Sequence, residues 1–391
     1  MSAPPERSAA ARVPLWPGAL AAGLVTALAI AFMWAENEWE VVGVLVTAVV
    51  GAVVARRTGW LEPATRALTQ REPAMNRLAI AGLFVFVAFF HDDHFPLLMV
   101  GTVLVYLLVC LGLTIQFGYA GMVNFAAAAF LGVGCYTAAV LTVHTAIPHL
   151  LVLAIGGAVA ALIGSILILP VLRTRGHYSA VVTIAFVLLF KTFLEVNDTL
   201  GGPQGLKLPS MQVLGWKFNQ NFNIAEIEFS FYVSYVLVAL LLVVIGFAIT
   251  RRLERSWIGL SLDAVRLDET ASACFGIHIA RWKIVAFTLG NFMAGVAGAL
   301  YALMLGFIAP TNFTFGDSLI MVSIVLLGGI GNPWGAALAA AIVVMLPEKL
   351  QLIQEYRFLL YASLVILVLL FRPEGLLPRR LRVYLPGWRP R

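Results

Sequence analysis

A polar stretch in the second half of the chain, Arg251–Lys283, separates two long apolar segments, Phe231–Ile249 and Ile284–Ile308. Each apolar segment has about the 20 residues that a helix needs to cross a bilayer. The polar stretch cannot lie in hydrocarbon, where its backbone and charges would lack partners, so we place it at a membrane surface. Basic residues gather in the cytoplasmic loops of membrane proteins, which predicts a cytoplasmic position for this stretch. Its basic residues are Arg251, Arg252, Arg255, Arg266, Arg281 and Lys283.

The composition extends this conclusion to the whole chain. Of the 391 residues, 61% are hydrophobic and 12% are charged, whereas soluble domains carry roughly 25% charged residues. The predicted fold class is an all-α polytopic membrane protein, a helical bundle of about 8 to 12 transmembrane helices. The formal net charge of +6 is attributed to cytoplasmic loops and gives no argument for binding nucleic acid. Cys110, Cys135 and Cys274 show no paired spacing, so we interpret them as packing residues.

Apolar runs between polar or glycine-rich segments predict the individual spans. The run Asp317–Met345 is too long for one comfortable span, and the sequence Gly328-Gly329-Ile330-Gly331-Asn332-Pro333 interrupts it, so we divide it in two. Some of the helices are therefore expected to be short or broken. The predicted spans are Pro14–Trp34, Trp39–Ala55, Leu78–Phe90, Pro96–Gln116, Gly121–Leu141, Leu150–Leu172, Tyr178–Val196, Phe231–Ile249, Ile284–Ile308, Asp317–Leu327, Trp334–Met345 and Phe358–Phe371.

The distribution of basic residues predicts the orientation of these spans. With both termini in the cytoplasm, most of the 26 lysine and arginine residues fall on the inner side. The largest outer loop is then Asn197–Glu228, where Gly201-Gly202-Pro203 predicts turns. Small residues recur at four-residue spacing in two spans, which is typical of helices that pack closely in lipid. They are Gly156, Ala160 and Gly164 in one span and Gly290, Ala294, Gly298 and Ala302 in the other.

Within the polar stretch, apolar and small residues follow helical spacing from Leu260 to Cys274. We predict one short helix at Ser261–Phe275, ended by Gly276. By pattern alone, an ordinary solvated loop helix explains this segment as well as a functional one does.

Few residues suggest chemistry. The cluster His91-Asp92-Asp93-His94 has metal-ligand side chains, but adjacent loop residues rarely converge on one ion, so we favour a solvated outer turn. No nucleotide-binding glycine loop, GxSxG or HExxH motif is present in the sequence, so we predict that the chain is not an enzyme. Lys191 lies inside a predicted span, where it either pairs with Glu195 or extends to the membrane surface. No ladder of acidic residues or histidines follows the spans, which weakens an ion-coupled secondary transporter without excluding it.

Several motifs in order resemble the LivM-type permease of branched-chain amino acid ABC importers. The resemblance covers roughly residues 96–377. The motifs are Gly118-Tyr119-Ala120-Gly121-Met122-Val123-Asn124-Phe125 and the small residues that follow, Leu172-Arg173-Thr174-Arg175-Gly176-His177-Tyr178 continuing to Gly201-Gly202-Pro203-Gln204-Gly205, Ala264-Val265-Arg266 with Asp268-Glu269-Thr270-Ala271 and Gly276-Ile277, and Leu327-Gly328-Gly329-Ile330-Gly331-Asn332-Pro333-Trp334-Gly335 closed by Phe371-Arg372-Pro373-Glu374-Gly375-Leu376.

The resemblance implies a permease subunit of the bacterial inner (plasma) membrane that works with other proteins. The implied partners are a second, LivH-like permease, two ATP-binding subunits, a periplasmic substrate-binding protein and the surrounding lipid. ATP and magnesium would bind to the ATPase subunits, and no cofactor is expected on this chain. The implied organisation is residues 1–76 as an N-terminal segment with two added spans, residues 77–377 as the permease domain with a coupling loop at 251–283, and residues 378–391 as a basic cytoplasmic tail.

The resemblance also assigns roles to residues. A cytoplasmic coupling helix would dock on an ATPase through Asp268, Glu269, Ala271, Ser272, Ala273 and Gly276. The interruption at Gly118–Gly121 marks a candidate translocation path, because broken helices at membrane depth often line a cavity. The candidate path residues are Tyr119, Gly121, Met122, Asn124, Phe125, Tyr178, Thr183 and Phe186.

The substrate is less constrained than the fold. Many family members carry Gln, Ser and His where Met122, Asn124 and Ala127 stand here, which implies a less polar cavity wall if these positions face the path. Branched-chain or other hydrophobic amino acids are the first expectation, and an aromatic acid, a short amide or urea is the alternative. An ion-coupled secondary transporter and a scaffold subunit without a path stay open as alternative functions.

Overall fold

The structure is a computed structural model. It describes residues 15–35, 37–60, 71–173, 178–213, 215–224, 227–349 and 374–379, together with a few isolated positions between 356 and 370. The chain divides into two compact units, Met1–Pro96 and Leu97–Arg391, and each is described by itself.

The first unit contains three described helices, α1 (Trp16–Trp34), α2 (Glu38–Arg57) and α4 (Glu72–Phe89). Helix α1 packs on α4, where the Thr26 side chain fills the space beside Gly82. The rings of Trp34 and Phe89 lie 5.2 Å apart at the ends of the same two helices. The first compact unit includes α4 and ends at Pro96. The predicted domain boundary after residue 76 stays a prediction.

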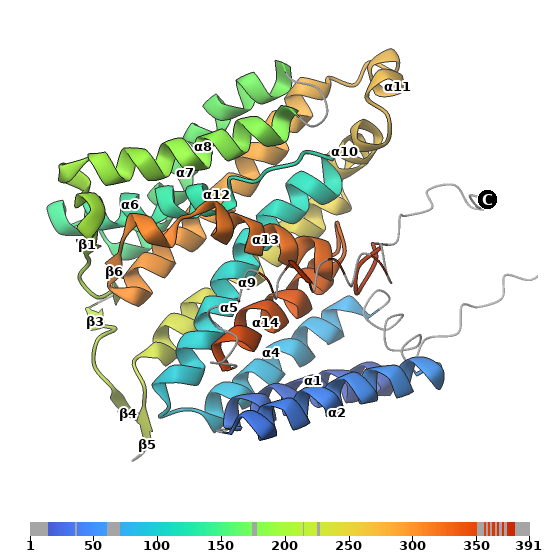
Figure 1. Ribbon diagram of the computed structural model, residues 1–391, viewed down its shortest axis with the longest axis vertical. Helices are drawn as coiled ribbons and strands as arrows, with labels where there is room; N and C mark the ends of the chain where they lie inside the picture. Colours follow the sequence, from blue (N-terminus) through green and yellow to red (C-terminus); the bar gives the residue numbers. More distant parts are fainter. Residues whose placement is uncertain are drawn as a thin grey trace, which may run out of the picture. The chain divides into compact units, whose positions relative to one another are not determined.

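The second unit is a bundle of helices (Figure 1). Its helices include α5, which begins at His94 and becomes the π-helix η1 at Thr114. The helices are α5 (His94–Leu113), η1 (Thr114–Tyr119), α6 (Ala127–His144), α7 (His149–Arg173), α8 (Tyr178–Val196), α9 (Tyr232–Glu254), α10 (Trp257–Leu267), α11 (Glu269–Cys274), α12 (Ile279–Leu305), α13 (Phe315–Gly328) and α14 (Pro333–Lys349).

The predicted all-α polytopic fold is confirmed. In the described part of the chain, nine helices are long and apolar enough to cross a membrane, and Trp39–Ala55 is a shorter apolar helix. The division of Asp317–Met345 is also confirmed, because α13 ends at Gly328 and α14 begins at Pro333. The span predicted at Gly121–Leu141 starts too early, because α6 begins only at Ala127. The spans predicted from Leu78 and Ile284 start too late, because α4 begins at Glu72 and α12 at Ile279. The predicted span at 358–371 falls mostly outside the described residues.

The core of the second unit is formed where α12 packs against α6 and α7 (Figure 1). The predicted small-residue ridge Gly290, Ala294, Gly298 and Ala302 is buried, which confirms its packing role, and its first member, Gly290, lies against Gly112 of α5 and Gln116 of η1. A Cβ atom on Gly298 would overlap the Leu131 carbonyl oxygen of α6. The absence of side chains therefore lets the two backbones approach closely, which increases dispersion contacts between helices in lipid.

The segment between α8 and α9 is built from turns and short strands. The 3₁₀ turns η2 (Asp198–Leu200) and η3 (Gly202–Gln204) precede β1 (Leu206–Lys207), which pairs antiparallel with β6 (Phe307–Ile308) after α12. Two small antiparallel pairs follow, and the turn η4 lies after β6. These elements are β2 (Gln212–Val213) with β3 (Trp216–Lys217), β4 (Phe222–Ile224) with β5 (Ile227–Phe229), and η4 (Pro310–Asn312). The predicted turn-rich loop is therefore present, and it is tied to the end of α12 by the β1–β6 pair.

Replacing Gly298 by leucine tests the close contact of α12 with α6. The larger side chain has no space beside Leu131, so we expect the variant to lose about 1–3 kcal/mol of stability. Thermal unfolding of the detergent-purified chain measures the effect. The matched control is Gly51→Leu, since a Cβ at Gly51 meets nothing within 4 Å. Equal melting temperatures for the two variants would contradict the close approach.

Candidate functional site

The backbone between α5 and α6 leaves helical geometry inside the bundle. The π-helix η1 ends at Tyr119, and the segment 120–126 has no regular structure before α6 begins at Ala127. The predicted interruption at Gly118–Gly121 is therefore confirmed. Gly121 has φ +66°, a conformation that glycine adopts without steric cost. The Met122 N–H donates to the Gln116 carbonyl across 2.8 Å, so part of the freed backbone is satisfied locally.

Three buried amide side chains hold this unwound segment, defined here as residues 120–126. Asn124 Nδ2 donates to Gln116 Oε1 at 2.7 Å and to Asn291 Oδ1 of α12 at 3.3 Å. Gln116 Nε2 donates to Asn291 Oδ1 at 3.0 Å and to the Phe287 carbonyl at 3.1 Å. All three amides are at most 1% exposed. Such a network is strong in a medium of low dielectric, because the alternative is an unpaired polar group in an apolar interior.

Two hydroxyl groups on other helices accept hydrogen bonds from the same region. The Phe125 N–H donates to Thr183 Oγ1 of α8 at 3.1 Å, and the Ala128 N–H donates to Ser318 Oγ of α13 at 3.0 Å. The Ala126 N–H donates to Asn124 Oδ1 at 2.8 Å, at the start of α6. The unwound segment is thus fixed by side chains from η1, α8 and α12, and the first turn of α6 that follows it is fixed by Ser318 of α13.

The structure brings together only some of the candidate path residues. Asn124, Phe125 and Thr183 lie in direct contact, whereas Phe186 stacks on Phe130 at 5.3 Å. The Tyr178 side chain lies outside the described residues. Tyr119, Asn124 and Thr183 are 0% exposed, so solvent does not reach these side chains in this conformation, and Met122 is 5% exposed. Sequence reasoning missed Gln116, Asn291 and Ser318, although a polar residue in an apolar helix was a signal for each.

The polar stretch between α9 and α12 contains two helices rather than the one predicted at Ser261–Phe275, so that prediction is wrong. Helix α10 ends at Leu267, and α11 starts at Glu269. Asp268 separates them with an extended backbone, and its Oδ1 accepts from the N–H groups of Thr270 at 2.8 Å and Ala271 at 3.0 Å. An aspartate side chain that satisfies free N–H groups starts a new helix, which explains the break. The predicted end of the segment at Gly276 is confirmed by its φ of +77°.

Helix α11 presents a small, exposed surface. Ala271, Ala273 and Gly276 are exposed, Ser272 is buried, and the Phe275 side chain is 86% exposed. Glu269 is half exposed and forms an ion pair of 2.6 Å with Lys283 of α12. The candidate coupling residues therefore share one short element. An exposed phenylalanine among alanines, flanked by charges, has the composition of a protein-binding surface.

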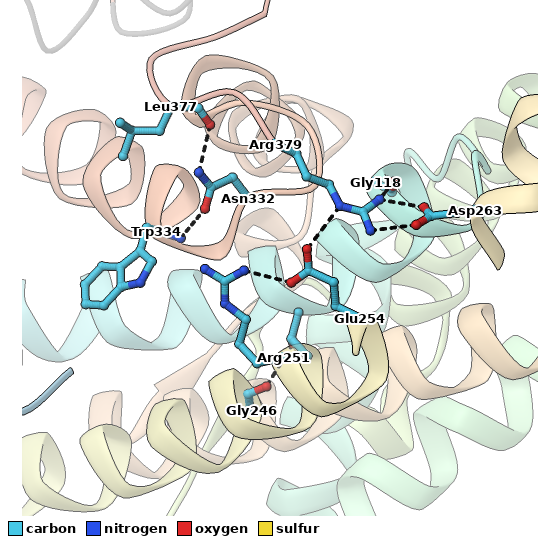
Figure 2. Close-up of polar contacts among 10 residues, drawn as sticks. Gly118, Gly246, Arg251, Glu254, Asp263, Asn332, Trp334, Leu377 and Arg379 are labelled. Atoms are coloured by element: carbon cyan, nitrogen blue, oxygen red, sulfur yellow. Dashed lines mark hydrogen bonds and ion pairs between the residues drawn. The ribbon is translucent and has the colours of Figure 1, made fainter. Parts of the chain in front are cut away.

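A cluster of charged residues lies where α9, α10, η1 and the C-terminal segment 374–379 meet (Figure 2). We call Arg251, Glu254, Asp263 and Arg379 the arginine cluster. Arg379 donates to both carboxylate oxygens of Asp263 at 2.6 and 2.9 Å and to Glu254 at 3.3 Å. Arg251 pairs with the other Glu254 oxygen at 2.7 Å.

The arginine cluster also reaches the end of η1. Arg379 Nη1 donates to the Gly118 carbonyl at 3.2 Å, and its guanidinium lies 4.3 Å from the centre of the Tyr119 ring. The side chain of Arg379 is 8% exposed. Burial by itself would lower the pKa of Arg379, but hydrogen bonds and charge from Asp263 outweigh burial and raise this pKa. The Arg379 guanidinium therefore keeps its positive charge at any working pH.

The residues that the structure describes hold no group of three or more histidine, cysteine, aspartate or glutamate side chains placed to bind a metal. Within a span, Lys191 pairs with Glu195 at 3.5 Å, which agrees with the expected ion pair. Neither feature adds a site to the unwound segment and the α10–α11 segment.

Comparison with known proteins assigns this architecture to a family. Residues 95–371 match the family described as "Branched-chain amino acid transport system / permease component". The chain is 35% identical over 289 residues to the high-affinity branched-chain amino acid transport system permease protein LivM of Escherichia coli, covering 70% of this chain and 68% of that protein. It is 26% identical to the probable LivM of Methanocaldococcus jannaschii, covering 70% of this chain and 91% of that protein.

A further relative, the permease protein LivH of Salmonella typhimurium, is 27% identical over 299 residues, covering 70% of this chain and 91% of that protein. The comparison with solved structures found no match. The matched residues begin at 95, close to the start of the second compact unit, and include the unwound segment and the α10–α11 segment. The chain belongs to the family of permease components of branched-chain amino acid transport systems.

Proposed function

We propose that this chain imports branched-chain or other hydrophobic amino acids across the bacterial inner membrane as one permease of an ATP-driven transporter. The names of the LivM and LivH relatives support the substrate class and a pair of permeases. The observation that carries the proposal is the exposed α11 within a basic segment between two membrane helices. ATP and magnesium bind to two separate ATPase subunits, and a periplasmic protein delivers the substrate.

Helix α11 is the surface that the ATPase engages. Its exposed alanines allow a partner groove to approach the backbone, and Phe275 offers an apolar anchor that is exposed in the isolated chain. Asp268 stabilises the first turn of α11, so the helix is formed before a partner binds. Preformed structure lowers the entropy cost of docking.

The unwound segment is the part of the permease next to the substrate path. A non-helical backbone inside a membrane bundle is tolerated where it is buried in protein or lines a cavity. The hydrogen bonds of this segment and of the first turn of α6 come from three neighbouring helices, so relative movement of those helices changes this region first. Alternating access follows from rocking of the helices around it, which opens the path to one side and then to the other.

Both termini and the α10–α11 segment face the cytoplasm in this proposal. The basic residues of Arg251–Lys283 support this orientation, because basic loops stay on the inner side. The short strands between α8 and α9 then face the periplasm, where the substrate-binding protein docks.

Reconstitution tests the proposed function directly. Liposomes containing this chain with its partner permease, both ATPases and the binding protein should accumulate labelled leucine only with internal ATP and magnesium. A panel with an aromatic acid, a short amide and urea identifies the substrate class. Uptake by this chain alone, driven by an ion gradient, would contradict the proposal and support a secondary transporter.

Reversing the charge of Glu269 tests the docking role of α11. Glu269→Lys should abolish ATP-driven uptake, because a basic residue replaces an acidic one on the docking surface. The side chain also pairs with Lys283, so the double variant Glu269→Lys with Lys283→Glu restores an internal ion pair without restoring the original surface. Uptake should stay abolished in the double variant. Full recovery there, or normal uptake in the single variant, would contradict docking through Glu269.

Removing the Thr183 hydroxyl tests the hydrogen bonding of the unwound segment. Thr183→Val leaves the Phe125 N–H without its acceptor at nearly constant volume, which costs about 1–3 kcal/mol in this segment. We expect slower uptake by an assembled transporter, measured in the same liposomes. Thr183→Ser keeps the hydroxyl and should transport normally. Thr137→Val is the matched control, since Thr137 Oγ1 bonds only to the Val133 carbonyl of its own helix in the described contacts. Equal effects of the two valine substitutions would contradict the proposed anchor.

A further inference from the structure

We propose that Arg379 is a positioning residue that transmits movement of α10 to the unwound segment. The inference rests on the proposed function, since it requires an ATPase that moves the α10–α11 segment. The C-terminal segment 374–379 is then part of the transport mechanism rather than a passive tail.

Arg379 joins elements that come from distant parts of the sequence. It contacts Asp263 on α10, Glu254 at the end of α9 and the Gly118 carbonyl at the end of η1 (Figure 2). The bond to Gly118 spans 261 positions of the chain, and the bond to Asp263 spans 116. One guanidinium thus connects the segment proposed to move with the ATPase to the backbone where α5 stops being helical.

The geometry makes this connection stiff. Both carboxylate oxygens of Asp263 accept from Arg379, which fixes the angle between the two side chains as well as their distance. The Arg379 side chain is 8% exposed, so water screens its ion pairs little. Tyr119 lies under the guanidinium and limits its movement on that side.

Arg379 contacts η1 close to the residue at which the helix ends and the unwound segment begins. The Gly118 carbonyl is near the C-terminal end of η1, where a positive charge is favourable. Gly118 also touches the backbone of Gly331 in the break between α13 and α14, because neither residue has a side chain to keep them apart. Arg379 itself packs against Gly331 through its Cδ atom. Movement of Arg379 therefore acts on two helix breaks at once.

Helix α10 also contacts the unwound segment directly, so the same shift of α10 would reach the segment by a second route. A Cβ atom on Gly121 would lie 2.8 Å from Cγ of Arg266, one turn of α10 after Asp263. Asp263 acts on the last residues of η1 through Arg379, and Arg266 touches the first glycine of the unwound segment directly. A shift of α10 is therefore transmitted to Gly118 and to Gly121, on either side of Tyr119, where η1 ends.

The docking of segment 374–379 does not depend on the Arg379 side chain. The N–H groups of Leu376 and Leu377 donate to the carbonyls of Leu327 and Gly328 at 2.8 and 3.0 Å. Asn332 Nδ2 donates to the Leu377 carbonyl at 3.0 Å. These bonds hold the segment against the break after α13, so replacing Arg379 removes the link to α10 while leaving the segment in place.

The test compares coupling in the reconstituted transporter before and after the link is removed. Arg379→Lys keeps a charge but cannot contact both Asp263 oxygens together with Glu254 and Gly118. The double variant Asp263→Asn with Arg379→Gln removes both charges of the closest pair, so neither is left buried without its partner. Lys191→Gln is the control, because it removes a lysine from an ion pair of α8 outside the arginine cluster.

The readouts are leucine uptake, ATP hydrolysis with and without the loaded binding protein, complex assembly and melting temperature. We expect Arg379→Lys and the double variant to assemble and to melt as the parent does. In both, ATP consumed per leucine transported should rise by about fivefold or more, the lower end of typical coupling between sites. The Lys191→Gln control should keep the parent ratio.

Two results would overturn the inference: an unchanged ratio in either Arg379 variant, or an uptake loss fully explained by a lower melting temperature or failed assembly in both. Failure of the proposed function looks different, since the parent complex itself would then show no ATP-driven uptake.

Discussion

The structure depends on satisfying a backbone that stops being helical inside an apolar bundle. Hydrocarbon offers no hydrogen bonds, so every N–H and C=O freed between η1 and α6 must find a partner within the protein. The Thr183 hydroxyl accepts from the Phe125 N–H, Asn124 Oδ1 accepts from the Ala126 N–H, and the Gln116 carbonyl accepts from the Met122 N–H. The side chains of Gln116 and Asn291 hold the Asn124 amide in place. The arginine cluster lies at the end of η1 where this break begins, since Arg379 donates to the Gly118 carbonyl.

The break interrupts helical structure between α5 and α6, while buried side chains accept from the N–H groups that it frees. A continuous helix from α5 through α6 would satisfy its own backbone but would transmit movement only as a rigid rod. Interrupting it shifts the hydrogen bonds to side chains on α8, α12 and α13, which can rearrange when those helices move. The cost is a set of buried polar side chains that must all find partners together.

Sequence patterns predicted the parts of this arrangement that depend on local composition. Apolar run length gave the spans, and the glycines at Gly118–Gly121 and Gly328–Gly331 gave both helix breaks. The contacts that join distant positions were not predictable in this way. The bond from Gln116 to Asn291 spans 175 positions, and nothing in either helix specifies the other as its partner. Asp268 was assigned to a docking surface. Its side chain also accepts from the first N–H groups of α11, and its extended backbone separates α11 from α10.

Two kinds of contact in the second unit differ in how they respond to force. The α12 contacts with α6 and α7 are made by glycines and alanines whose backbones touch, so sliding these helices would bring atoms into overlap. The contacts of α10, η1 and segment 374–379 are made by charged side chains, and the paired hydrogen bonds of Arg379 to Asp263 fix their geometry. Under the proposed mechanism, movement imposed at α10 passes through this link to the unwound segment, while the glycine-packed core moves as one body. This division of roles explains why a charged residue near the C-terminus lies against the break between α5 and α6.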